Sequence, residues 1–223
     1  AFPCVDEPEA KARFTIIITS DDAKDIILSN MPVEDEQIVG ESKRVRFMQT
    51  PPMSSYLVAF IASELVSYET KSQHGVKITA YATPAQNVSD LKIGGDFAAD
   101  VLDYYDDLFK VPYPLPKLDL VAIPDFDAGA MENWGLMTFR EVAMLANEKS
   151  STEQKIYIST VIAHEISHMW FGDLVTMKWW DDLWLNESFA NTMELYATAK
   201  VRPEYDAWDD FYTGTVQLAL RRD

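Results

Sequence analysis

The spacing of apolar residues in this 223-residue chain changes near residue 81, and this change limits the folds that the chain can adopt. Before that point, short β-branched or aromatic runs alternate with turns that contain acidic residues, proline or glycine, which is typical of β-strands. After it, the apolar spacing shifts from two residues towards 3.6 residues, the period of an α-helix. We therefore expect an α+β protein in which a β-rich segment, residues 1–81, precedes a mixed α/β segment, residues 82–223.

The first segment contains five runs that we predict to be strands. They cover residues 14–19, 26–29, 43–49, 56–62 and 66–70. The last run leads through a turn that ends at Gly75 into another strand-like run, so we expect a β-hairpin over residues 68–79.

The second segment is predicted to hold four helices and two short strands. An apolar stripe over residues 97–108 has helical spacing, and Pro112 prevents its continuation. Ser151 and Gln154 have the form of a capping box, which predicts a helix that begins there and ends near Gly172. Two further helices are expected over about residues 183–200 and 204–220. Buried strands are expected at 118–123 and 135–140.

The charge composition argues against nucleic acids and membranes as partners. The chain has 36 acidic against 19 basic side chains, a net charge of −17, which repels nucleic-acid phosphates and anionic lipids. We therefore expect no nucleic-acid partner and no membrane partner, and the apolar runs are far shorter than the roughly 20 residues that cross a bilayer. The single cysteine, Cys4, cannot form an internal disulfide, which is compatible with a reducing compartment. We expect a cytoplasmic location.

The run His164-Glu165-Ile166-Ser167-His168 is a candidate for metal chemistry. Residues four apart on a helix point the same way, so both imidazoles can bind one ion. Glu165 lies about 100° further round the helix, where it can reach a water on the metal without binding the metal itself. The chain has only three histidines, so two at this spacing beside a glutamate predict a zinc site.

A catalytic zinc site usually has a third protein ligand and leaves its fourth position to water. Glu187, separated from His168 by 18 residues, is the best candidate, because its predicted helix can fold back against the first. The apolar neighbours Trp184, Leu185 and Phe189 make an unpaired charge costly there, which favours a metal or another partner for Glu187.

Glu194 follows Glu187 by seven residues, about two helical turns, so the two carboxylates share a face. One interpretation is that Glu194 accepts a ring N–H from a ligand histidine and thereby fixes its tautomer. Asn191 competes for that position, and an ordinary polar residue of the helix is the other interpretation of Glu194. Periodicity leaves these interpretations open.

Three ordered motifs together resemble the aminopeptidase N family of zinc metallopeptidases, which are gluzincin exopeptidases. The resemblance spans essentially the whole chain and also includes residues 2–8, 112–119, 170–176 and 184–190. Such a set is far more specific than a lone His-Glu-x-x-His. The three motifs are Gly129-Ala130-Met131-Glu132-Asn133, His164 to His168, and Glu187.

The resemblance implies one Zn²⁺ per chain, held by His164, His168 and Glu187. It implies that Glu165 takes a proton from the attacking water and later passes it to the departing amine. It also implies that Glu132 binds the free α-ammonium of a peptide substrate, so that the cut falls one residue from the end.

The rest of the segment around Glu132 is implied to bind substrate as well. The backbone at Gly129 and Ala130 would pair with the extended peptide as an added strand. Met131 would contact the first side chain of the substrate or only fill space. Asn133 completes this substrate-binding segment.

By the same resemblance, residues 1–81 end the N-terminal β domain of the family, and residues 82–223 begin its thermolysin-like catalytic domain. The family's oxyanion-stabilising tyrosine would lie beyond residue 223, and we assign that role to none of Tyr196, Tyr205 and Tyr212. We therefore expect an internal fragment with little activity by itself, cut from an aminopeptidase. The alternatives are a non-catalytic scaffold member of the family and a relative of the epoxide hydrolase type.

Overall fold

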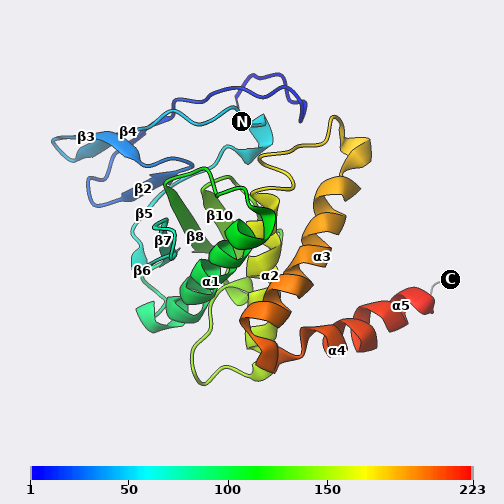
Figure 1. The fold of residues 1–223 in the computed structure, drawn as a ribbon. Coiled ribbons are helices and arrows are strands. Elements are labelled where there is room, and N and C mark those ends of the chain that lie inside the picture. Colours follow the sequence, from blue (N-terminus) through cyan, green and yellow to red (C-terminus); the bar gives the residue numbers. More distant parts are fainter. Residues whose placement is uncertain (1, 222–223) are drawn as a thin grey trace.

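The computed structural model describes residues 2–221. A β-rich N-terminal segment, residues 2–63, adjoins a five-stranded sheet, two long helices pack on that sheet, and a third long helix packs on these two helices (Figure 1). The strands and helices confirm the predicted α+β class.

Five short strands form two small antiparallel sheets in the N-terminal segment. One sheet has the order β1-β4-β3, and the other pairs β2 with β5. β3 was not among the predicted strands, because three of its seven residues are acidic and lie in succession, and acidic residues have low intrinsic strand propensity. The strands are β1 (Ile17–Ser20), β2 (Ile26–Ser29), β3 (Val33–Val39), β4 (Ser42–Phe47) and β5 (Phe60–Ser63).

The strand predicted over residues 56–62 is shorter than expected. A 3₁₀ turn, Ser55–Leu57, occupies its first part, and β5 begins at Phe60. Leu57 is fully buried, and its carbonyl oxygen accepts hydrogen bonds from the side chains of Asn30 and Asn133. Side-chain donors here take the place of a strand partner, which local sequence does not reveal.

The larger sheet has the order β6-β7-β8-β10-β9. β6 and β7 form the predicted hairpin, with Gly75 at φ +90° in its turn. β8 runs parallel to β7 and to β10, whereas β9 is antiparallel to β10 and forms an edge of the sheet. The strands are β6 (Val66–Lys71), β7 (Lys77–Ala82), β8 (Lys117–Ile123), β9 (Ala130–Met131) and β10 (Leu136–Arg140).

Residue 81, where the sequence predicts a domain boundary, lies inside β7. β6 and β7 pair with each other and β7 pairs with β8, so one sheet contains residues from both sides of that boundary. The change in apolar period marks where the helices begin, and the sheet begins earlier.

Helix α1 packs against β6 and β7, α2 packs against α1 and reaches β9, and α3 packs on α2 and α1 (Figure 1). The helix predicted over residues 204–220 begins three residues later and contains a π-turn, Tyr212–Val216. Its side chains are mostly exposed from residue 212 onward, where the chain leads away from the sheet. The helices are α1 (Lys92–Phe109), α2 (Thr152–His168), α3 (Trp184–Val201), α4 (Ala207–Phe211) and α5 (Gln217–Leu220).

The central strands have both faces covered, as their apolar runs require. In β8, Leu118 and Leu120 join the main core beneath the helices. Val121 packs on the opposite face with Leu28 of β2 and Leu136 of β10. The N-terminal segment therefore packs directly against the larger sheet, through Leu28 of β2. Within residues 2–221, no helix is both long enough and apolar enough to cross a bilayer.

Candidate metal centre and active site

The C-terminal end of α2 carries both candidate ligand histidines. The helix begins after Ser151, whose hydroxyl accepts a hydrogen bond from the backbone N–H of Gln154 at 3.2 Å. His164 and His168 lie one turn apart, so their rings reach the same side, and their Nε2 atoms are 3.0 Å apart. The helix thus directs two imidazole nitrogens at one position.

Glu187, the third candidate ligand, lies in the first turn of α3, which packs against α2. Its Oε2 is 3.3 Å from Nε2 of His164 and 3.8 Å from Nε2 of His168. Ligand atoms at about 2.0–2.1 Å from a tetrahedral zinc ion lie about 3.3 Å from one another. The two imidazole nitrogens and the carboxylate oxygen therefore fit a tetrahedral divalent metal ion in both type and spacing.

Glu187 and two apolar residues near it in the sequence are substantially exposed in the structure. Trp184 is 58% exposed, Phe189 is 44% exposed, and the side chain of Glu187 is itself 45% exposed. The hydrogen bond with His164 lowers the pKa of Glu187, and burial only partly opposes this effect. The apolar neighbours therefore do not bury Glu187, and its carboxylate has the two histidines as partners.

Each candidate ligand ring has a partner at its other nitrogen. Oε2 of Glu194 lies 2.7 Å from Nδ1 of His164, and the backbone oxygen of Phe171 lies 3.0 Å from Nδ1 of His168. An Nδ1–H that donates to these oxygens leaves Nε2 of both rings free to bind a metal. Asn191, the alternative to Glu194, is exposed.

The charges around His164 favour a cation at this position. Burial by itself lowers the pKa of His164, but hydrogen bonds with Glu187 and Glu194 outweigh burial and raise the pKa to about 10. The same carboxylates that stabilise a proton on this ring would also stabilise a divalent cation beside it.

Glu165 is 6% exposed and lies beside the histidine pair. Glu165, Glu132 and His168 each offer a ligand-type atom, and these atoms lie within 4.8 Å of one another. Burial raises the pKa of Glu165 well above its usual range, Glu132 raises it further, and His164 opposes the shift. A carboxyl group in this environment accepts a proton more readily than a solvated one, as general acid–base catalysis requires.

The segment that the family resemblance assigns to substrate binding begins at the edge of the sheet. Ala130 and Met131 form β9 and pair with Phe139 and Thr138 of β10. Within residues 2–221, the outer edge of β9 pairs with no strand. An extended peptide can add to such an edge through backbone hydrogen bonds. Gly129, which precedes β9, is exposed, and Met131 packs against the main core.

Glu132 and Asn133 follow β9, and each is 7% exposed. Thr138 donates a hydrogen bond from Oγ1 to Oδ1 of Asn133 at 3.1 Å. Asn133 itself donates from Nδ2 to the backbone oxygen of Leu57 at 3.4 Å. The structure thus gives Asn133 a part in shaping the segment, and its contact with substrate remains a prediction.

Three buried polar side chains that sequence reasoning missed lie near this site. The carboxylate of Asp173 is buried and has no hydrogen-bond partner among the described residues, and the buried hydroxyl of Tyr56 faces the side chain of Asn186. Burial raises the pKa of Asp173 well above its usual range, Glu132 raises it further, and Lys11 opposes the shift. Asp173 and Asn186 lie in residues 170–176 and 184–190, which are part of the family resemblance, but the sequence of these ranges does not distinguish the two residues from their neighbours.

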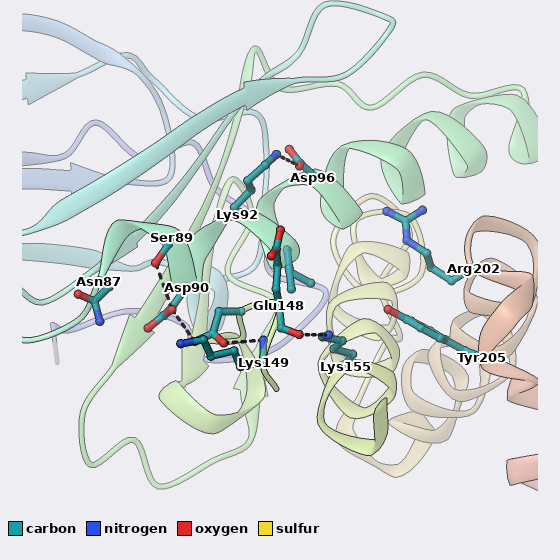
Figure 2. Close-up of a pocket in the computed structure, with 12 residues that line it drawn as sticks. Asn87, Ser89, Asp90, Lys92, Asp96, Glu148, Lys149, Lys155, Arg202 and Tyr205 are labelled. Carbon is teal, nitrogen blue, oxygen red and sulfur yellow. Dashed lines mark hydrogen bonds and ion pairs between the residues drawn. The ribbon is translucent and has the colours of Figure 1, made fainter. Parts of the chain in front are cut away.

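A cavity of about 690 Å³ lies away from the candidate site, between the start of α1, the start of α2 and the end of α3 (Figure 2). Lys155 lines it, about 20 Å along α2 from His168 at 1.5 Å per residue. Lys92 in its wall is paired with Asp96, and Lys155 donates to the backbone oxygen of Glu148. We assign no ligand to this cavity.

Comparison with known proteins agrees with this geometry. The family model described as the Peptidase family M1 domain matches residues 95–223, and the one described as the Peptidase M1 N-terminal domain matches residues 1–57. The first includes every candidate ligand together with Glu132 and Glu165.

Curated relatives match along the whole chain. The chain is 47% identical over 225 residues to an aminopeptidase N of Lactococcus lactis, covering all of this chain and 26% of the relative. It is 48% identical over 221 residues to a probable aminopeptidase 2 of Sulfurisphaera tokodaii, covering 99% of this chain and 28% of the relative. It is 46% identical over 225 residues to endoplasmic reticulum aminopeptidase 2 of Bos taurus, covering all of this chain and 23% of the relative. The chain thus spans about a quarter of the length of these relatives, and it belongs to peptidase family M1.

Proposed function

We propose that the natural protein carrying this sequence is a zinc aminopeptidase that removes N-terminal residues from peptides. The observation that carries the proposal is the convergence of His164, His168 and Glu187 beside two buried glutamates, Glu165 and Glu132. The M1 relatives that are named aminopeptidases support the same reading.

His164, His168 and Glu187 would hold the zinc ion, and Glu194 would orient the ring of His164. When bound, zinc supplies Lewis-acid polarisation of the scissile carbonyl and lowers the pKa of water. The protein's own part is to fix the ligand atoms, with one imidazole held by a carboxylate and the other by a backbone oxygen.

Glu165 would act as the general base towards the attacking water and then as the general acid towards the departing amine. It belongs to α2, so it is positioned by the same helix as the two histidines and needs no separate loop. Its burial keeps competing solvent away and favours uptake of a proton.

Glu132 would bind the α-ammonium of the substrate, because a buried carboxylate is a strong acceptor for a cationic donor. The edge of β9 directly before it would pair with the peptide backbone. An ammonium site at the end of such a strand allows only the terminal residue to reach the metal, which makes the enzyme an exopeptidase.

The test is Glu165→Gln in the natural protein, with release of an N-terminal amino acid and zinc content measured together. We expect kcat to fall by roughly 10²- to 10⁴-fold, because the general base is lost, while zinc content stays at the wild-type level. Glu153→Gln is the matched control, since Glu153 is an exposed glutamate in the first turn of the same helix.

Full activity of Glu165→Gln would reject Glu165 as the base. A wild-type protein that holds zinc but releases no amino acid from any peptide would reject the aminopeptidase and favour a scaffold. A wild-type protein that hydrolyses an epoxide and no peptide would favour the epoxide hydrolase alternative.

A further inference from the structure

The turn after β2, in the N-terminal segment, holds the loop that carries Glu132. Asn30 is 1% exposed, and its Nδ2 donates hydrogen bonds to the backbone oxygens of Trp134 at 2.9 Å and Leu57 at 2.8 Å. Its Oδ1 accepts a hydrogen bond from the backbone N–H of Ala59 at 3.1 Å. Both amide hydrogens and the amide oxygen are therefore used, and one bond reaches a residue two positions after Glu132.

A buried lysine joins the same two segments. Lys117 of β8 donates from Nζ to the backbone oxygens of Ser29 and Gly135, each at 2.7 Å. Its third donor reaches Oδ2 of Asp119 at 2.6 Å. The ammonium group thus has all of its donors satisfied, and it fixes Gly135 against the residue that precedes Asn30.

The backbones of the turn and the loop also meet directly. Gly135 has φ +80°, and a Cβ at this position would lie 2.3 Å from the backbone oxygen of Asn30. Only glycine permits this close approach together with that backbone conformation. Residues 134 and 135 therefore have little freedom to move relative to the N-terminal segment.

We propose that Asn30 is a positioning residue for substrate-amine recognition, acting through the loop that carries Glu132. The inference rests on the proposed function, in which Glu132 binds the substrate ammonium. The hydrogen bond from Asn30 to Trp134 fixes the path of the chain just after Glu132, and Asn133 is tied to the same carbonyl of Leu57. Loss of the Asn30 amide removes the restraint nearest to Glu132 on its C-terminal side, while Lys117 still holds Gly135 and the metal ligands stay in place.

This assignment gives the N-terminal segment a specific part in the reaction. Asn30 lies within the match to the M1 N-terminal domain, whereas Glu132 lies within the match to the M1 domain. A carboxylate that binds an ammonium is sensitive to displacements of less than 1 Å, so a restraint from outside its own domain affects affinity directly.

The experiment uses Asn30→Ala in the natural protein and a pair of inhibitors that differ only in the amine. Leucine hydroxamate carries the α-amine, and 4-methylpentanehydroxamate lacks it, while both carry the same metal-binding group. We expect Asn30→Ala to raise the inhibition constant of leucine hydroxamate roughly 10- to 100-fold and to change that of 4-methylpentanehydroxamate by less than about two-fold.

Ser29→Ala is the matched control. Its buried hydroxyl donates to the backbone oxygen of Ala59 at 2.8 Å, so this variant loses a buried hydrogen bond to the same segment without touching the loop. We expect the ratio of the two inhibition constants to stay at the wild-type value in Ser29→Ala.

The outcomes separate the two proposals. A wild-type protein that binds both hydroxamates equally would reject amine recognition by Glu132, and with it the proposed function. A wild-type preference for leucine hydroxamate that survives in Asn30→Ala would reject only the role of Asn30. Asn30→Ser, which leaves a smaller gap, replaces the alanine variant if that variant does not fold, and failure of both to fold would assign Asn30 to folding alone.

Discussion

The two candidate ligand histidines have outer partners of different strength. His164 faces the carboxylate of Glu194 at 2.7 Å, whereas His168 faces the backbone oxygen of Phe171 at 3.0 Å. A carboxylate carries a full negative charge and increases the basicity of the ring more than a neutral carbonyl does. The contribution of His164 to metal affinity should therefore depend strongly on one side chain.

Glu194→Ala should lower zinc affinity by roughly 10- to 100-fold, the usual effect of removing an outer partner of a ligand histidine. Competition with a fluorescent zinc chelator measures the change. Asn191→Ala is the control, because Asn191 is an exposed polar residue on the same helix. Equal zinc affinity in the two variants would contradict the role assigned to Glu194.

The candidate ligands could be predicted because helix geometry by itself brings His164 and His168 together. The choice between Glu194 and Asn191 stayed open, since periodicity places both near the same face and the packing of α3 on α2 decides between them. The backbone oxygen of Phe171 has no sequence signal, because every residue has a carbonyl group. The restraint from Asn30 was also hidden, because it joins segments 104 residues apart.

Among the helices and strands, the sequence predicted the ends that are set by hydrogen bonds between residues close in the chain. The turn at Gly75 and the cap at Ser151 are both present, although Gln154 uses its side chain to donate to Val142 and does not complete a capping box. β3 and the start of β5 could not be predicted. β3 depends on pairing with β4, and β5 begins late because Leu57 is engaged by distant side chains.

Ser151→Ala should lower the free energy of unfolding by about 1 kcal/mol, because the N-cap of α2 loses its side-chain acceptor. Urea denaturation measures this change. Thr152→Ala is the control, since Thr152 is exposed at the next position and does not cap the helix. Zinc affinity should stay unchanged in both variants, because the cap lies at the far end of α2 from the histidines. A loss in Thr152→Ala as large as that in Ser151→Ala would contradict the assignment of the cap.

For the whole molecule, the N-terminal segment and the larger sheet are held together by buried polar contacts as well as by apolar packing. Lys117 connects Ser29 of the first with Gly135 and Asp119 of the second. Burial lowers the pKa of Lys117 and raises the pKa of Asp119, while each group opposes the shift of the other. Removing one member therefore leaves the other as a buried charge without its partner.

Lys117→Met should lower the free energy of unfolding by about 3–5 kcal/mol, since it leaves Asp119 without its ion-pair partner and removes one donor each from the backbone oxygens of Ser29 and Gly135. Lys77→Met is the matched control in the neighbouring strand, where Lys77 and Glu69 form an ion pair with side chains 57% and 61% exposed. An exposed pair of this kind contributes about 0–1 kcal/mol. Urea denaturation of both variants compares the two losses directly. Because Lys117 joins the segment that holds Asn30 to the loop that holds Glu132, a loss as small as that of Lys77→Met would contradict a polar connection between the two parts of the molecule.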